Sequence, residues 1–169
     1  FRPSFTSAAG FEVGAGTGYH ARRMARAVAP GGTVYAVDVQ PEMLRMLEHL
    51  AREDGLDNFR VVAGTQRSAQ LPPDSIDLAL MVDTYHELAN PFEVIDSLVR
   101  ALRPDGRLVL VEYRAEDPKV NIRPLHKMSE AQVRKEMVVH PLRWERTART
   151  LPRQHLIVFR KAPPRRAVR

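Results

Sequence analysis

The chain has 169 residues, of which 44% are hydrophobic and 27% are charged. This length and composition favour one globular domain with one sizeable core and exclude disordered and fibrous classes. The absence of cysteine excludes disulfides, thiolate metal sites and cysteine nucleophiles. No apolar run is long enough to span a bilayer and the first residues lack a signal-peptide pattern, so we expect a cytoplasmic protein without membrane association.

The net charge of +6 is unevenly distributed, because residues 119–169 carry 14 of the 26 basic residues and 3 of the 20 acidic ones. A basic surface can bind nucleic acid through phosphate contacts. These charges are spread without an interleaved aromatic platform, so we favour a solvated surface and keep nucleic acid as an alternative partner. We predict a single domain over residues 1–162 and a disordered basic tail over residues 163–169.

The predicted strands, taken in chain order, are short and continuously apolar, which is typical of a parallel sheet covered on both faces. The first of them is weak, and the last two are joined by a short link that predicts antiparallel pairing. The predicted strands are residues 11–13, 33–37, 59–63, 78–82, 108–111, 142–147 and 155–161.

Between these strands, apolar residues recur at helical spacing in three segments, within residues 21–28, 43–50 and 95–102. A cap at Asn90 with a capping-box partner at Glu93 predicts where the third helix begins. Ser129 predicts the start of a short fourth helix to about Val139. Other boundary residues agree, namely Pro30, Gly31 and Gly32 after the first helix, and Pro41 and Gly55 at the ends of the second.

Strand followed by helix, three times over, predicts an α/β fold. We expect a Rossmann-like open, mostly parallel sheet with helices on both faces and an antiparallel C-terminal strand pair. In such a sheet, ligands bind beyond the carboxyl ends of the strands.

A glycine loop, Gly14-Ala15-Gly16-Thr17-Gly18, follows the first predicted strand. Glycines at this position allow a tight turn and a close approach of the backbone to a ligand. A dinucleotide fingerprint would need glycine at position 19, which is Tyr19, and no phosphate-binding Gly-Lys-Ser/Thr sequence is present. The loop therefore predicts a ligand site of another kind.

Asp38 ends the second predicted strand, twenty residues beyond Gly18. A carboxylate there can accept hydrogen bonds from both hydroxyls of an adenosine ribose. Helix capping by Asp38 is the alternative, but Pro41 as the first helical residue puts Gln40 at the cap position. We therefore expect Asp38 to bind a ribose.

Four segments together resemble the S-adenosylmethionine-dependent class I methyltransferases, in particular the broad small-molecule, type 11-like group. They are FEVGAGTGYHARRMARAV, VYAVDVQPEML, LPPDSIDLALMVDTYHEL and LRPDGRLVLVEYR, which occur in order between residues 11 and 114. The resemblance implies that the chain transfers a methyl group from S-adenosylmethionine to an acceptor, for which we expect a small molecule. The alternatives are a module that binds the cofactor without turnover and an RNA methyltransferase that uses residues 119–169.

The resemblance also implies roles for individual residues. The glycine loop would line the methionine part of the cofactor, Glu12 would engage its amino end and Asp38 would hold its ribose. Val39 and Met43 would pack on the adenine, and Asp83 would contact the methionyl portion. The adenine edge would meet the backbone of Thr65 and the side chain of Gln66, where the family commonly has an acid. The loop residues with this implied role are Gly14, Ala15, Gly16 and Gly18.

The catalytic candidates follow the strand at 78–82. His86 is the first choice as a base because its reference pKa lies near neutrality, and Tyr85 would line the acceptor pocket. For Arg123 and His126 we favour a solvated loop over a segment that folds over the site. We expect no metal site, because no two histidines are three to five residues apart. Residues 2–10 show no helical period, so we also expect the family's N-terminal cap helices to be absent.

Overall fold

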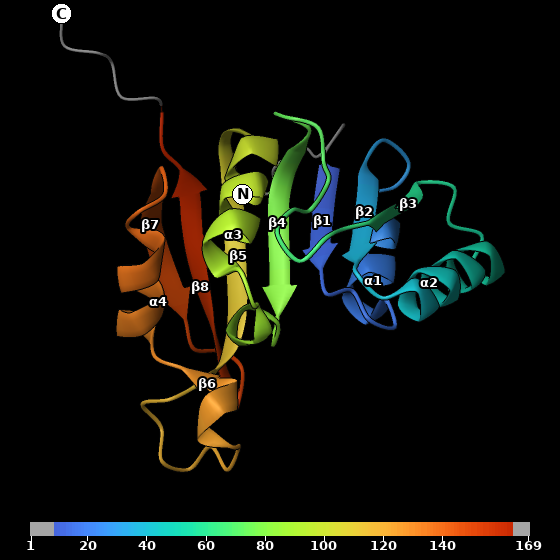
Figure 1. Ribbon diagram of the computed structural model, residues 1–169. Helices are drawn as coiled ribbons and strands as arrows, with labels where there is room; N and C mark the ends of the chain where they lie inside the picture. Colours follow the sequence, from blue (N-terminus) through green and yellow to red (C-terminus); the bar gives the residue numbers. More distant parts are fainter. Residues whose placement is uncertain (1–8, 164–169) are drawn as a thin grey trace, which may run out of the picture.

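The computed structural model describes residues 9–163 and contains one eight-stranded sheet (Figure 1). The predicted strands are all present, and a two-residue strand, β6, joins them. The strands are β1 (Ala9–Val13), β2 (Thr33–Asp38), β3 (Phe59–Ala63), β4 (Ile76–Val82), β5 (Leu102–Arg114), β6 (Lys127–Met128), β7 (Leu142–Ala148) and β8 (Gln154–Lys161).

The strand order is β3-β2-β1-β4-β5-β8-β7, with β6 paired to β5. The first five strands are parallel to one another. β8 is antiparallel to both β5 and β7. The order reverses direction beside β1, which places a crevice at the carboxyl ends of β1 and β4. The predicted Rossmann-like sheet with an antiparallel C-terminal pair is confirmed.

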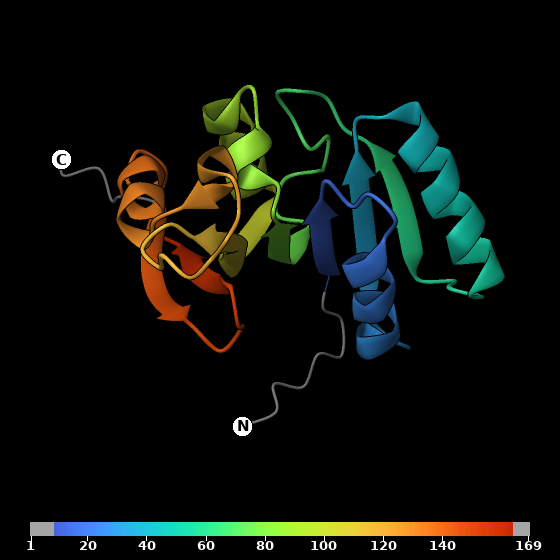
Figure 2. The ribbon, with the colours of Figure 1, turned by 90° about the horizontal axis from the view of Figure 1, so that it is seen from below.

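Helices cover both faces of the sheet (Figure 2). α1 and α2 bury Ala21, Ala25 and Leu47 in one core, whereas α3 and α4 bury Ile95 and Met137 in the other. Burial of apolar side chains on both faces explains why the strands are continuously apolar. The helices are α1 (Tyr19–Val28), α2 (Pro41–Glu53), α3 (Pro91–Ala101) and α4 (Glu130–Met137), with short 3₁₀ helices η1 (Tyr85–Glu87) and η2 (Pro124–His126).

The helix ends test the predicted caps. The Ser129 hydroxyl accepts a hydrogen bond from the Gln132 backbone N–H, so the predicted cap of α4 is confirmed. The predicted capping box of α3 is wrong, because Asn90 is the N-cap residue but its side chain makes no cap bond. Glu93 instead lies 3.6 Å from the guanidinium of Arg67, because the loop after β3 passes beside the first turn of α3.

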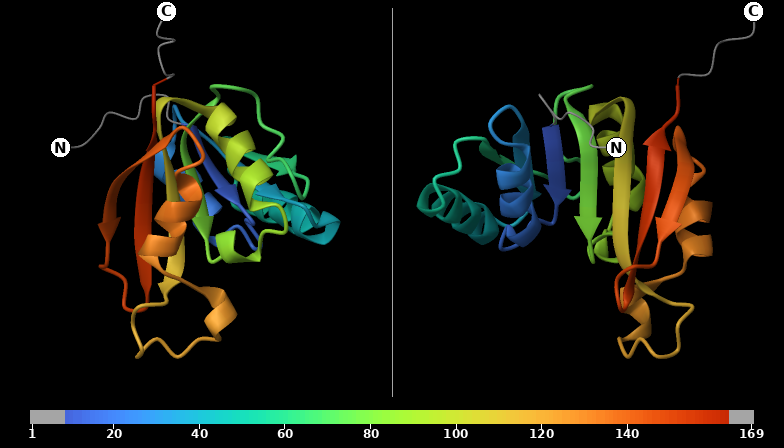
Figure 3. Two further views of the ribbon diagram at one scale, coloured as in Figure 1. Left: turned by 60° about the vertical axis from the view of Figure 1, so that its left-hand side comes forward. Right: turned by 180° about the vertical axis from the view of Figure 1, so that it is seen from behind.

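The segment between β5 and β6 lies beyond the carboxyl ends of β4 and β5 (Figures 1 and 3). It ends in η2, which contacts η1 after β4. This end of the sheet therefore gathers residues that are far apart in the chain.

Several predictions remain outside what the structure describes. Within residues 9–163, no helix is long and apolar enough to cross a membrane. Residues 1–8 and 164–169 lie outside the described residues, and with them most of the predicted tail and of the segment where cap helices were expected to be absent. The division at residue 162 and the cytoplasmic location stay predictions.

Candidate functional site

A cavity of about 420 Å³, which we call the glycine-loop cavity, lies at the carboxyl ends of β1 and β2. This is the edge where open parallel sheets bind ligands. Its wall is formed by the loops that follow β1, β2, β3 and β4 and by the starts of α2 and α3. The lining residues are Val13, Gly14, Gly16, Val37, Asp38, Val39, Gln40, Met43, Thr65, Gln66, Ser68, Ala69, Thr84, Glu87, Leu88, Ala89 and Val94.

The absence of a side chain has a different consequence at each of two glycines of the loop. Gly14 has φ 65°, and a Cβ there would lie 2.6 Å from Cγ2 of Thr84. The loop after β4 can approach β1 this closely only because position 14 has no side chain. Gly16 has φ 48°, and a Cβ there would have no neighbour closer than 3.9 Å. Its missing side chain therefore leaves free space on the cavity wall.

The carboxylate of Asp38 lies in the cavity wall, fixed by two backbone donors. Oδ2 accepts from the Gly16 N–H at 3.1 Å and Oδ1 accepts from the Gln40 N–H at 2.9 Å. The residue is 7% exposed. Each carboxylate oxygen can accept more than one hydrogen bond, so the two backbone contacts orient Asp38 and leave acceptor capacity toward the cavity.

Several other residues predicted to bind the cofactor line this cavity as well, on the loops after β1, β2 and β3 and in the first turn of α2: Gly14, Gly16, Val39, Met43, Thr65 and Gln66. Ala15 and Gly18 do not line it. Ala15 is buried and donates its N–H to the Val37 carbonyl at 3.2 Å. Gly18 is the left-handed N-cap of α1. These two positions shape the turn rather than the cavity wall.

Glu12 also lies outside the cavity wall. It is 3% exposed, and its Oε2 accepts from the Ala21 N–H at 2.8 Å, in the first turn of α1. Burial raises the pKa of Glu12 to about 7, against a smaller lowering by that hydrogen bond. The contact holds the start of α1 against the end of β1, so Glu12 supports the glycine loop from behind.

A second cavity, of about 530 Å³, lies beside η1 and also includes Glu87 in its wall. We call it the histidine-side cavity. Asp83, directly after β4, lies here with φ 49°. Its Oδ2 accepts from Gln154 Nε2 at 2.6 Å, whereas its buried Oδ1 has no partner among the described residues. Burial raises the pKa of Asp83. The other lining residues are His86, Tyr113, Asn121, Ile122, Arg123 and His126.

A hydrogen-bonded chain runs from β5 to this cavity through His86. Nδ1 of His86 lies 2.6 Å from Oε2 of Glu112, and Nε2 lies 3.0 Å from Nδ1 of His126. The other Glu112 oxygen accepts from the Tyr85 N–H at 3.0 Å. Glu112 is fully buried, and burial raises its pKa although His86 opposes the shift. The prediction of a solvated loop is wrong for His126, because the segment before β6 folds against η1.

Tyr85 lines neither cavity. It is 5% exposed, and its hydroxyl donates to Oε2 of Glu136 on α4 at 2.8 Å. Burial and the neighbouring carboxylate raise the pKa of the Tyr85 hydroxyl. The side chain therefore joins η1 to α4, away from the space in which an acceptor pocket was expected.

Thr84 and Glu87 belong to the segment of catalytic candidates after the strand at 78–82, whereas Glu112 was not predicted to take part in the site. Glu112 carried a signal, because it is an acid inside the otherwise apolar end of a buried strand, LVLVEY. A charge in such a position is rarely buried without a partner. Which cavity Thr84 and Glu87 line depends on where the loop after β4 turns, and the sequence does not express this.

Within residues 119–163, four of the eleven basic side chains form ion pairs: Arg134, Arg149, Arg160 and Lys161. Arg160 contacts Glu145 at 3.0 Å and Lys161 contacts Asp74 at 3.0 Å. Glu130 accepts two further guanidinium contacts from α4 and the loop after β7. Charges neutralised in this way contribute less to a phosphate-binding surface.

The comparisons with known proteins agree with this geometry. The family model described as "Methyltransferase domain" matches residues 11–110, which include most of β1, all of β2 to β4 and most of β5. The chain belongs to this methyltransferase domain family. S-adenosylmethionine is accordingly the cofactor of this domain.

Two curated relatives show how far the similarity extends. "Uncharacterized methyltransferase YcgJ" of Bacillus subtilis (strain 168) is 32% identical over 108 residues, which are 63% of this chain and 42% of that protein. "Demethylmenaquinone methyltransferase" of Tropheryma whipplei (strain Twist) is 29% identical over 117 residues, which are 69% of this chain and 46% of that protein. The match thus spans less than half the length of each relative.

Solved structures support the fold. The crystal structure of a SAM-dependent methyltransferase from Aquifex aeolicus aligns with a TM-score of 0.85 at 24% sequence identity, covering 92% of this chain and 82% of that chain. At this identity the likeness shows the fold. The predicted class I fold is therefore confirmed by the family model and by the structure.

Proposed function

We propose that the protein transfers a methyl group from S-adenosylmethionine to a small-molecule acceptor by in-line displacement. The observation that carries the proposal is the glycine-loop cavity with the Asp38 carboxylate fixed in its wall, within a domain of the methyltransferase family. A small acceptor is supported by the demethylmenaquinone named for one relative.

The residues fit the cofactor in three respects. Gly16 leaves space where a side chain would stand, and Asp38 has acceptor capacity suited to two ribose hydroxyls. The buried Oδ1 of Asp83 has no partner among the described residues, and a cationic amine or sulfonium nearby would compensate for its burial. A cationic ligand therefore suits this end of the sheet.

Within this proposal the lining residues bind and orient. Asp38 holds the ribose, Val39 and Met43 pack on the adenine, and Thr65 and Gln66 contact the adenine edge. Glu12, Ala15 and Gly18 act indirectly, by holding the glycine loop and the start of α1. When bound, S-adenosylmethionine supplies a methyl carbon activated by positive sulfur. Alignment of two reactants can be worth about 7 to 11 kcal/mol, so orientation is the main task of the chain.

The acceptor is proposed to bind in the histidine-side cavity, which shares Glu87 with the glycine-loop cavity. For a hydroxyl or ammonium acceptor, His86 is the proposed base. In the tautomer in which Nδ1–H donates to Glu112, the lone pair of neutral His86 is on Nε2, which is the nitrogen facing the cavity residue His126. Tyr85 assists by positioning, since its backbone N–H and its hydroxyl hold Glu112 and α4 in place.

Calorimetry with S-adenosylhomocysteine tests the proposal. We expect saturable binding by the unaltered protein and its loss in Asp38→Ala. Asp57→Ala is the matched control, because Asp57 is exposed and precedes β3 at the opposite end of the parallel strands. Absence of binding by the unaltered protein at millimolar ligand contradicts the proposal.

Turnover is a separate measurement. Conversion of S-adenosylmethionine to S-adenosylhomocysteine with a panel of hydroxyl, amine and quinol acceptors is expected to depend on the acceptor. Binding without conversion by any member of the panel would favour the alternative of a binding module. A gel shift with RNA at 0.2 M salt would favour the RNA alternative.

A further inference from the structure

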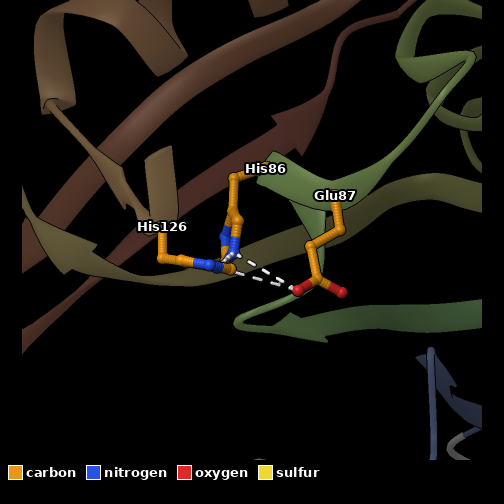
Figure 4. A group of neighbouring side chains, drawn as sticks. All are labelled: His86, Glu87 and His126. Atoms are coloured by element: carbon orange, nitrogen blue, oxygen red, sulfur yellow. Dashed lines mark hydrogen bonds and ion pairs between the residues drawn. The ribbon is translucent and has the colours of Figure 1, made fainter. Parts of the chain in front are cut away.

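Three potential metal ligands converge beside the histidine-side cavity (Figure 4). His86 and Glu87 come from η1, and His126 comes from η2, 40 residues further along the chain. Nε2 of His86 and Nδ1 of His126 are 3.0 Å apart, and each lies 3.8 Å from Oε1 of Glu87. The two imidazole rings and the carboxylate point toward one another.

We propose that His86, Glu87 and His126 bind a divalent transition-metal ion, with Zn²⁺ as the ion that the ligand set favours. Four-coordinate zinc has metal–nitrogen and metal–oxygen distances near 2.0 to 2.2 Å, which separates neighbouring ligand atoms by about 3.4 Å. The three observed separations lie on both sides of this value. An ion between them therefore needs shifts of only a few tenths of an ångström, about the range of side-chain adjustment at a surface.

A buried carboxylate behind the cluster is an independent reason for the assignment. Glu112 is fully buried and its Oε2 lies 2.6 Å from Nδ1 of His86. Metal-binding histidines almost always donate their other ring N–H to such a group, which fixes the tautomer and increases ligand basicity. Here the arrangement leaves the Nε2 lone pair directed at His126 and Glu87. Glu112 is itself held by the Tyr85 N–H, so this support is rigid.

The open side of the cluster indicates what kind of metal site this is. Three protein ligands leave a fourth position of a tetrahedral ion for water or a ligand, as in catalytic rather than structural zinc sites. All three residues line the histidine-side cavity, which Asp83 and Asn121 also line. Glu87 and His126 are partly exposed, with side-chain exposures of 61% and 43%, so an ion can enter from solvent.

The donor set selects among metals. Two imidazole nitrogens and one carboxylate oxygen suit zinc, copper, nickel or iron, whereas Mg²⁺ and Ca²⁺ prefer oxygen ligands only. Among divalent ions that bind nitrogen, affinity rises to Cu²⁺ and is lower for Zn²⁺, so it is the ligand separations, close to those of a tetrahedral ion, that favour Zn²⁺. Zn²⁺ and Co²⁺ are the appropriate probes, because Co²⁺ occupies similar sites and reports tetrahedral geometry by its visible absorption.

This inference goes beyond the proposed function, because it requires neither S-adenosylmethionine nor methyl transfer. The proposed base and the proposed metal site both use Nε2 of His86. Nε2 of neutral His86 has a single lone pair, so it can accept a proton only while no metal occupies it. A bound ion would instead polarise the ligand in its fourth position.

The test is titration of the protein, purified without a polyhistidine tag and treated with chelator, with Zn²⁺ followed by calorimetry and with Co²⁺ followed by absorption. We expect saturation at one equivalent and tetrahedral Co²⁺ bands. His126→Ala is expected to abolish the bands, and Glu112→Gln to weaken the affinity by about 10- to 100-fold. His49→Ala is the control, since exposed His49 also lies near a carboxylate, 3.3 Å from Glu53, but on α2.

Circular dichroism verifies that each variant is folded. The metal titration is carried out without S-adenosylmethionine, so its result does not depend on cofactor binding. Absence of one-equivalent saturation, or equal affinity of His126→Ala and the unaltered protein, overturns the assignment. Binding that is lost in His49→Ala but kept in His126→Ala overturns it as well. S-adenosylhomocysteine binding, measured in the same samples, separates failure of this inference from failure of the proposed function.

Discussion

The glycine-loop cavity and the histidine-side cavity share Glu87 but are built in opposite ways. Most residues that line the first lie within a few positions of the ends of β1, β2, β3 or β4, and the starts of α2 and α3 complete its wall. The second combines η1, the end of β5 and η2, which contribute contacts between residues 26 and 40 positions apart. One site is therefore local to the strand ends, whereas the other depends on how separate segments fold against each other.

This difference has a consequence for function. In the glycine-loop cavity the backbone supplies most of the geometry, since Asp38 is held by the N–H groups of Gly16 and Gln40. In the histidine-side cavity side chains hold one another, from Glu112 through His86 to His126. We expect the first to tolerate changes outside its loop and the second to fail when one member is removed.

The largest expected effect is on this second network. Removing the Glu112 carboxylate with Glu112→Ala leaves the Tyr85 N–H and His86 Nδ1 without their buried partner. A buried donor left without its acceptor costs about 1 to 3 kcal/mol, so for two such groups we expect the free energy of unfolding to decrease by roughly 2 to 6 kcal/mol. Urea denaturation measures it. Unchanged stability would mean that the network contributes nothing to the fold.

The next largest effect tests the close packing of the glycine loop against the loop after β4. Gly14→Ala places a methyl group 2.6 Å from Thr84 Cγ2 at φ 65°, and we expect it to destabilise the protein by about 2 kcal/mol. Thr84→Ala removes the nearest atoms, so the double variant should recover part of this loss. A double-mutant cycle measures the coupling. Strictly additive effects would show that close packing is not the reason for glycine at position 14.

A smaller effect depends on pH. The pKa of Glu12 is raised from 4.5 to about 7, so folding favours its protonated form. Its contribution to stability is fully present below about pH 4.5 and is lost as pH rises through 7. Glu12→Gln keeps an acceptor for the Ala21 N–H, and we expect it to be more stable than the unaltered protein at pH 8 by about 1 to 2 kcal/mol, but not at pH 4. Equal differences at both pH values would contradict a raised pKa.

The smallest effect is expected away from both cavities. Arg149 contacts Glu130 at 3.4 Å with 61% of its side chain exposed. Exposed ion pairs are worth little, so Arg149→Ala should change the free energy of unfolding by less than about 0.5 kcal/mol. Thermal denaturation with and without added salt measures this. A large loss would indicate that the ion pairs of the basic third support the β7–β8 pair.

The parts of the molecule that could be predicted from the sequence depend on residues that are close together in the chain. The strands and the glycine loop were predicted because their signals lie in adjacent residues, such as the apolar run at 33–37 and the three glycines before α1. Asp38 was predicted because a strand end fixes where its side chain points. The capping box at Asn90 failed although its residues are present, because Glu93 lies beside Arg67 instead.

The histidine-side cavity was not predictable by the same means. The search for metal ligands by spacing compared histidines three to five residues apart, whereas His86 and His126 are 40 apart. The segment between β5 and β6 is held by single hydrogen bonds, including the one from the Ala115 N–H to the Met128 carbonyl. No periodicity in the sequence expresses such contacts.

The sequence by itself determined the sheet, the order of helices and strands and the family of the chain, because apolar periodicity and turn residues act over a few positions. Only the tertiary structure decided which side chains meet around η1. Bringing Glu112, His86 and His126 together requires β5 and η2 to pack against η1, and the free energy for that packing comes from burial across the whole sheet rather than from the residues that meet.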